Sequence, residues 1–137
     1  MTQKRKNFLA YAQEIRNLGY RVIINGDALW NYGYIINDKD EIGCFQLDDW
    51  GCGVRFSTMH YGTRTMGTGF GLDDSFNGHT KITKNIVDRC FVRVPAHCCA
   101  PGWCRTKEGR DDLERVKKYK GSDYIAMHWN KDKLVEL

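Results

Sequence analysis

Four short β-rich runs in the first half of the chain constrain the fold more than any other feature of the sequence. They cover residues 20–24, 30–36, 42–47 and 54–59, and clusters of turn-forming residues separate them. The first connection contains Asn25-Gly26-Asp27, a strong hairpin signal because Asn and Gly accept the positive φ angles of tight turns. Strands joined by connections this short pair with their sequence neighbours in antiparallel fashion. The sequence therefore predicts a four-stranded antiparallel meander.

Residues 4–18 have the clearest helical pattern in the chain. Apolar side chains recur there every three or four residues, which places them on one stripe of a helix. Gly19 follows at the position where a left-handed glycine commonly ends a helix. We expect this helix to pack on the sheet.

The last third of the chain is also predicted to be mainly helical, after an irregular middle. The expected elements are a helix over residues 81–89, a short strand over 90–94, a helix over 111–120 and a helix over 123–130 with Ser122 as its N-cap. The fold class is therefore α+β, in a single domain over residues 1–137. Helices from both ends of the chain are expected to cover one face of the four-stranded antiparallel sheet.

Composition and charge narrow the class of protein. With 42% hydrophobic and 28% charged residues, the chain has the composition of a folded globular domain. It lacks both an apolar run of the roughly 20 residues that span a bilayer and a signal peptide, so we expect a cytoplasmic protein with no membrane partner and mainly reduced cysteines. The net charge of +4 permits a nucleic-acid partner and excludes a strongly acidic DNA mimic.

The glycine-rich stretch over residues 50–72 is the most promising place for a binding site. If Val54 and Phe56 point to the core of the last strand, Arg55 lies on its open face. Arginine and aromatic side chains provide most of the energy of protein interfaces. The predicted partner-binding residues on this face and in the loop that follows are Arg55, Ser57, His60, Tyr61, Arg64 and Phe70.

Residues 50–72 fit a catalytic site less well than a binding site. The glycines of residues 67–71 resemble a phosphate cradle, but the lysine and spacing of nucleotide-binding loops are absent, so tight turns are the better interpretation. Ser57 and His60 could be a nucleophile and its base, yet three residues apart on a strand they point to opposite faces. An enzyme that acts on phosphoesters or nucleotides would need His60 to lie close to His79 or to a pair of aspartates. Those pairs are Asp48/Asp49 and Asp73/Asp74.

A cysteine-rich segment offers a candidate metal site. Its four potential zinc ligands are Cys90, His97, Cys99 and Cys104. Zinc sites usually present two separated chelating pairs, whereas Cys98 and Cys99 are adjacent and point apart. Buried, small, apolar cysteines are therefore the favoured interpretation, and no cofactor is expected.

The order of these motifs resembles that of small accessory proteins encoded by tailed bacteriophages. The resemblance covers residues 50–72 and 110–125 and rests on Arg55-Phe56-Ser57-Thr58-Met59-His60, Gly67-Thr68-Gly69-Phe70 and Val116-Lys117-Lys118-Tyr119-Lys120. It implies a non-catalytic, single-domain protein that acts in a bacterial host. Such proteins bind a host protein or ribonucleoprotein complex, and anti-CRISPR and other anti-defence inhibitors belong to this class.

Two functions from different classes follow. The first is a phage-type binding protein that inhibits or modulates a host macromolecule through the Arg55 face and the loop after it. The alternative is a nucleic-acid or nucleotide-binding module that uses the same face, whose affinity would fall steeply with salt.

Overall fold

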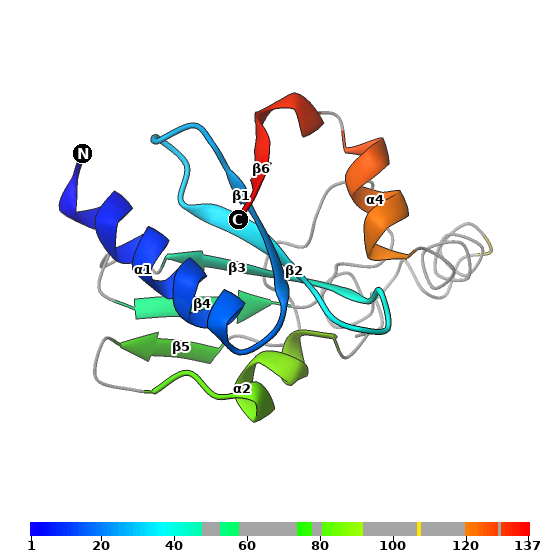
Figure 1. Cartoon of the computed structure of the whole chain (residues 1–137), viewed down its shortest axis with the longest axis horizontal. Coiled ribbons are helices and arrows are strands. Elements are labelled where there is room, and N and C mark those ends of the chain that lie inside the picture. Colours follow the sequence, from blue (N-terminus) through cyan, green and yellow to red (C-terminus); the bar gives the residue numbers. More distant parts are fainter. Residues whose placement is uncertain (48–52, 58–73, 78–80, 92–106, 108–119, 129) are drawn as a thin grey trace.

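The computed structural model describes residues 1–47, 53–57, 74–77, 81–91, 107, 120–128 and 130–137 (Figure 1). The strands are β1 (Arg21–Asn25), β2 (Tyr32–Ile36), β3 (Ile42–Leu47), β4 (Gly53–Ser57), β5 (Asp74–Asn77) and β6 (Leu134–Glu136). The helices are α1 (Gln3–Asn17), α2 (Lys84–Asp88) and α4 (Gly121–Met127), with 3-10 turns η1 (Arg89–Phe91) and η4 (Lys131–Lys133). The α+β class is thus confirmed.

One antiparallel sheet holds all six strands, in the order β5-β4-β3-β2-β1-β6. The meander predicted for the first four is confirmed by the pairing of β1 with β2, β2 with β3 and β3 with β4. The predicted strand count was wrong, because β5 and β6 extend the sheet at its two edges. Both are short, and β6 pairs with a strand more than a hundred residues earlier in the chain, so neither leaves a periodic pattern in the sequence.

Helix α1 packs on one face of the sheet. Its fully buried side chains Phe8, Ala12 and Ile15 pack in one cluster with residues of β1 to β4, and the rings of Phe8 and Phe45 stack 5.3 Å apart. The helix ends as expected, since Gly19 has a φ of 105°.

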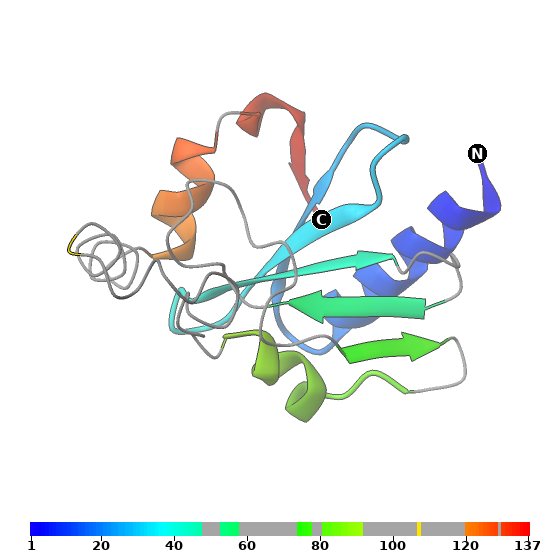
Figure 2. The same cartoon turned by 180° about the vertical axis from the view of Figure 1, so that it is seen from behind.

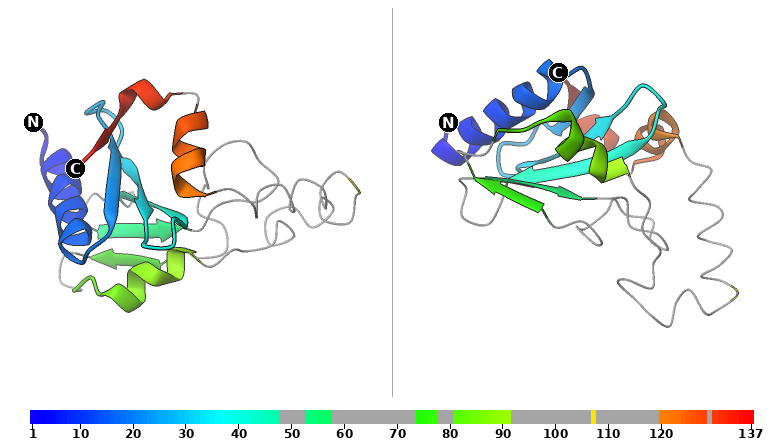
Figure 3. Two further views of the ribbon diagram at one scale, coloured as in Figure 1. Left: turned by 45° about the vertical axis from the view of Figure 1, so that its right-hand side comes forward. Right: turned by 90° about the horizontal axis from the view of Figure 1, so that it is seen from below.

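Helix α4 lies on the opposite face, which corrects the prediction that helices from both ends cover the same one. Tyr124 of α4 packs in a second cluster with Ile23, Tyr34, Ile36 and Ile42. The left view of Figure 3 places α1 and α4 on opposite sides of the β1–β2 hairpin. Figure 2 shows the sheet from the face that α1 does not cover. The physical reason is that β1 to β3 are buried on both faces, so each apolar face requires its own cover.

Helix α2 and turn η1 lie on the α1 side of the sheet. The helix predicted over residues 81–89 is shorter than expected, and Cys90 belongs to η1 rather than to a strand. Gly43 of β3 leaves room for η1, because a Cβ atom at position 43 would overlap Cys90. The predicted strand residues 92–94 and the predicted helix over residues 111–119 lie outside the described residues.

The N-terminus of α4 is capped by Asp40 in the turn between β2 and β3, not by Ser122 as predicted. The Ser122 backbone N–H and hydroxyl donate to the Asp40 carboxylate at 3.1 and 2.7 Å, and the Gly121 N–H donates to the Asp40 carbonyl at 2.6 Å. Asp40 adopts a positive φ of 58°, a conformation that Asp and Asn tolerate better than most residues. One turn residue therefore fixes where α4 begins.

We expect Asp40→Ala to lower the free energy of unfolding by about 1–3 kcal/mol, because it removes the cap and places alanine at a positive φ. Asp40→Asn keeps an oxygen acceptor and tolerates the conformation, so its loss should be clearly smaller. Urea denaturation of both variants measures the difference. Equal losses would show that the carboxamide oxygen cannot replace the carboxylate in capping α4.

Candidate functional site

Arg55 lies where the sequence predicted it. Val54 and Phe56 are fully buried in the core under α1, and Arg55 between them is half-buried on the opposite side of β4. Ser57 occupies the end of β4 and pairs with Cys44 of β3. The predicted alternation of this strand is therefore confirmed, and Arg55 shares its face of the sheet with α4.

Arg55 belongs to a polar row that crosses four strands on this face. The row consists of Arg55, Gln46, Tyr32 and Asn25. Gln46 lies opposite both Arg55 and Tyr32 in the strand register, and Tyr32 is hydrogen-bonded to Asn25. Asn25 donates to the Tyr32 hydroxyl at 2.8 Å. Tyr32 and Tyr34 meet edge to face with centroids 5.9 Å apart. An arginine, a glutamine and an aromatic ring in one row are suited to contacts with a polar partner surface.

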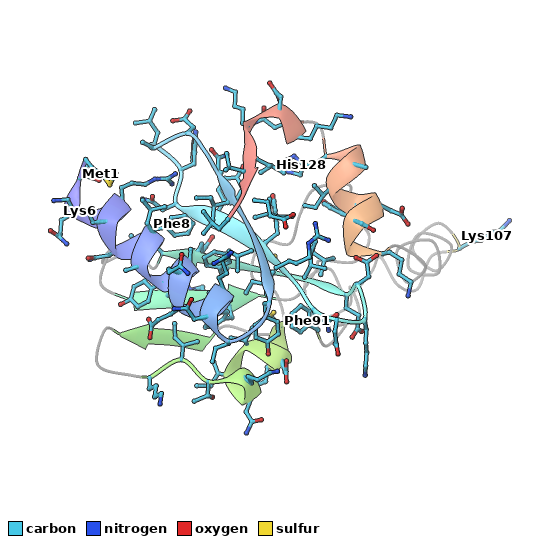
Figure 4. The ribbon with its side chains drawn as sticks, viewed as in Figure 1. Met1, Lys6, Phe8, Phe91, Lys107 and His128 are labelled. Atoms are coloured by element: carbon cyan, nitrogen blue, oxygen red, sulfur yellow. The ribbon has the colours of Figure 1, made fainter. Side chains whose placement is uncertain are left out.

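His128 and Tyr34 form a partly buried pair next to this row. The Tyr34 hydroxyl lies 3.0 Å from Nε2 of His128, while Nδ1 accepts the backbone N–H of Asn130 at 3.1 Å. Because Nδ1 is an acceptor, the neutral imidazole carries its proton on Nε2. Figure 4 shows His128 between α4 and β6. Burial lowers the pKa of His128 below its ordinary value and raises the pKa of Tyr34.

Most of the other predicted site residues lie outside the described residues. They are His60, Tyr61, Arg64 and Phe70 of the predicted binding loop, and His97, Cys99 and Cys104 of the candidate zinc site. The paired aspartates and His79 of the enzyme hypothesis also lie outside them, apart from the backbone of Asp74 in β5. Their roles stay predictions.

Cys90 is a free cysteine whose side chain is fully buried. Burial raises its pKa well above the ordinary value, so the thiolate that would bind a metal is disfavoured there. In the part of the chain that the structure describes, His, Cys, Asp and Glu side chains do not gather in groups of three or more that could hold a metal.

The sequence interpretation missed a hydrogen-bonded loop that exposes two large apolar side chains. We call residues 26–31, between β1 and β2, the Leu29–Trp30 loop. Leu29 is 82% exposed and Trp30 is 57% exposed. The region 30–36 was predicted to be a strand, but β2 begins only at Tyr32, which leaves Trp30 outside the sheet.

Hydrogen bonds hold the loop in one conformation. The Asp27 N–H donates to Asn25 Oδ1 at 2.7 Å, and the N–H groups of Leu29 and Trp30 donate to the Asp27 carboxylate and carbonyl, each at 3.0 Å. These Asx-type turns use the short side chains that the Asn25-Gly26-Asp27 motif supplies. At the loop's base, the Gly26 N–H donates to the Lys133 carbonyl next to β6.

Arg5 of α1 braces the same loop. Its side chain is only 5% exposed, and its guanidinium donates to the carbonyls of Asn25 and Trp30 at 2.8 and 3.0 Å. The guanidinium also lies 5.4 Å from the ring centroid of Phe8. A buried arginine with these partners fixes the loop to the helix, so the two exposed apolar side chains start from a preorganised backbone.

Comparison of the chain with protein-family models, with curated proteins and with solved structures finds no match in any of the three. Among the described helices, none is long and apolar enough to cross a membrane.

We expect Arg5→Ala to lower the free energy of unfolding by about 2–3 kcal/mol, because it leaves buried carbonyl groups without their charged donor. The exposed neighbour Lys6 supplies a matched control on the same helix, and Lys6→Ala should change stability by less than about 0.5 kcal/mol. Chemical denaturation measures both. A loss for Arg5→Ala as small as that of the control would mean that the brace contributes little.

We expect His128 to make stability depend on pH. Its pKa is lower in the folded than in the unfolded chain, so the unfolded chain binds more protons as the pH falls through the ordinary histidine pKa. The contribution is complete above that pKa and is lost on acidification, when protonation of Nδ1 also removes the acceptor for Asn130. Urea denaturation at about pH 7.5 and 5.5 should show a smaller loss for His128→Gln than for the wild type; identical losses would contradict the assignment.

Proposed function

We propose that this chain is a non-enzymatic binding protein of the phage accessory type, which inhibits or modulates a host protein or ribonucleoprotein complex. The observation that carries the proposal is the Leu29–Trp30 loop. Tryptophan is among the residues that most often dominate interface energy. A braced backbone also lowers the entropy cost of binding, because little ordering remains to be done.

The predicted contact surface is the second feature that supports the proposed binding function. Arg55 and Tyr32 lie in one polar row on the sheet face opposite α1, and the proposed contacts His60, Tyr61, Arg64 and Phe70 follow β4 in the sequence. The resemblance of residues 50–72 to phage accessory proteins gives the proposed setting, a bacterial host cytoplasm, and the proposed class, anti-CRISPR or other anti-defence inhibitors.

Binding to nucleic acid is the second candidate, favoured by the combination of Arg55 with Tyr32 in the polar row. Exposed faces of antiparallel sheets can stack bases on aromatic rings while arginine contacts the phosphates. This candidate predicts an affinity that falls by about one power of salt concentration for each phosphate contact.

An affinity pull-down of the tagged chain from bacterial lysate, with and without nuclease, tests the proposal. We expect one stoichiometric protein partner that survives nuclease treatment. Trp30→Ala should weaken its binding by about 2 kcal/mol or more, while the melting temperature stays nearly unchanged because the side chain is exposed. Arg16→Ala, a substitution of an exposed residue on α1 outside the Leu29–Trp30 loop, serves as the control.

Two results would contradict the proposal. Full recovery of the partner by the Trp30→Ala variant would remove the Leu29–Trp30 loop as its carrier. Loss of every partner on nuclease treatment, together with weaker recovery by Arg55→Ala at raised salt, would support the nucleic-acid candidate instead.

A further inference from the structure

A second surface lies at the other end of α1 from the Leu29–Trp30 loop. It is a groove of about 800 Å³ between the start of β1, the β2–β3 turn and α2. A space of this size accommodates a side chain or a small molecule. Its lining residues are Gly19, Tyr20, Asn37, Asp38, Lys39, Glu41, Lys84, Asp88 and Phe91.

Two aromatic rings form the floor of the groove. Tyr20 and Phe91 are each 7% exposed, and their ring centroids lie 5.8 Å apart. The Tyr20 hydroxyl donates to Asp88 at 2.5 Å, which fixes the orientation of the ring. The Lys84 ammonium lies 5.6 Å from the Tyr20 ring centroid, so this ring already accepts a cation.

Carboxylates outnumber ammonium groups by one in the lining of the groove, although the chain as a whole is positive. Three carboxylates, from Asp38, Glu41 and Asp88, face the two ammonium groups of Lys39 and Lys84, which gives a formal charge of −1 in a chain of net charge +4. Gly19, which lines the groove, follows the C-cap residue Leu18 of α1, so the negative end of the helix dipole lies beside the groove.

Burial raises the pKa of the Tyr20 hydroxyl, the hydrogen bond to Asp88 raises it further, and the charges of Asp88 and Asp38 act in the same direction. Both carboxylates therefore act on the floor of the groove from different elements, α2 and the β2–β3 turn.

We infer that this groove binds a guanidinium group, such as the side chain of an arginine presented by a partner. A guanidinium is planar and stacks on an aromatic ring, and its forked donors match a carboxylate at the ring's edge. The Tyr20 ring and the Asp88 carboxylate are held side by side by their hydrogen bond, which supplies both requirements. Lys84 is exposed and occupies the ring face in the free chain, so the bound group replaces it.

Titration of the isotope-labelled full chain with N-acetyl-arginine-amide, followed by NMR, tests the inference. We expect saturable shifts at Tyr20, Lys39 and Asp88, with a dissociation constant in the millimolar range, about what a single charged side chain provides. N-acetyl-citrulline-amide has nearly the same shape without the charge and should cause no saturable shift. Methylguanidinium, which has the same single charge and lacks the peptide groups, separates the two sources of a guanidinium: tighter binding of methylguanidinium would identify a small free guanidinium compound, and tighter binding of the amide a protein side chain.

Variants with opposite expected effects sharpen the test. Asp88→Asn and Asp38→Asn should each weaken binding about threefold, whereas Lys84→Met should strengthen it because the competing cation is removed. Using two acidic positions keeps the test valid if loss of the Tyr20–Asp88 bond perturbs the fold. Asp132→Asn, an exposed carboxylate in η4 outside the groove, is the matched control and should change nothing.

Three outcomes of the titration overturn the inference. N-acetyl-citrulline-amide causes the same shifts as N-acetyl-arginine-amide, or the arginine compound causes no saturable shifts. The third outcome is that inorganic phosphate, in place of the arginine compound, shifts the signals of Tyr20 and Asp88. It is also overturned if Lys84→Met weakens binding, since that result would mean that Lys84 supports the bound group instead of competing with it for the Tyr20 ring.

Discussion

Strands β1 to β3 carry buried side chains on both faces of the sheet, and the rest of the structure depends on covering each face. Strands β1 to β3 bury residues on both sides, so one amphipathic helix cannot shield them from water. Helix α1 covers the first face through Phe8, Ala12 and Ile15, and α4 covers part of the second through Tyr124. The Asp40 cap and the Tyr34–His128 pair follow from this arrangement, because both attach the C-terminal segment to the second face.

Helix α1 connects the fold to both candidate binding surfaces. Near its N-terminus, Arg5 braces the Leu29–Trp30 loop, and its C-terminal end opens onto the groove floored by Tyr20 and Phe91. The two surfaces differ in chemistry, since the loop presents apolar side chains and the groove presents carboxylates. A partner that contacts both would need an apolar pocket and a basic side chain about the length of α1 apart, which is about 22 Å for fifteen residues.

Local sequence patterns were sufficient to predict those elements whose conformation depends on residues close to one another in the chain. The α1 stripe, the glycine that ends it, the first four strands and the alternation around Arg55 were all predicted from spacing alone. The Asn25-Gly26-Asp27 motif correctly predicted a turn, but not that the turn would expose Trp30. Arg5 donates to the Trp30 carbonyl, and the spacing of residues in an amphipathic helix does not distinguish a buried arginine such as Arg5 from a solvated one.

The sequence by itself determined the α+β class, the order of the central strands and the position of Arg55 on the face opposite α1, because these depend on periodicity and turn chemistry. Only the tertiary structure decided that β6 joins β1, that α4 takes the second face, and that Asp40 rather than Ser122 caps it. It also decided that Tyr20, Asp38 and Asp88 share one groove. These features join residues that are distant in sequence, and the free energy that selects them comes from burial and hydrogen bonds that exist only once the chain has folded.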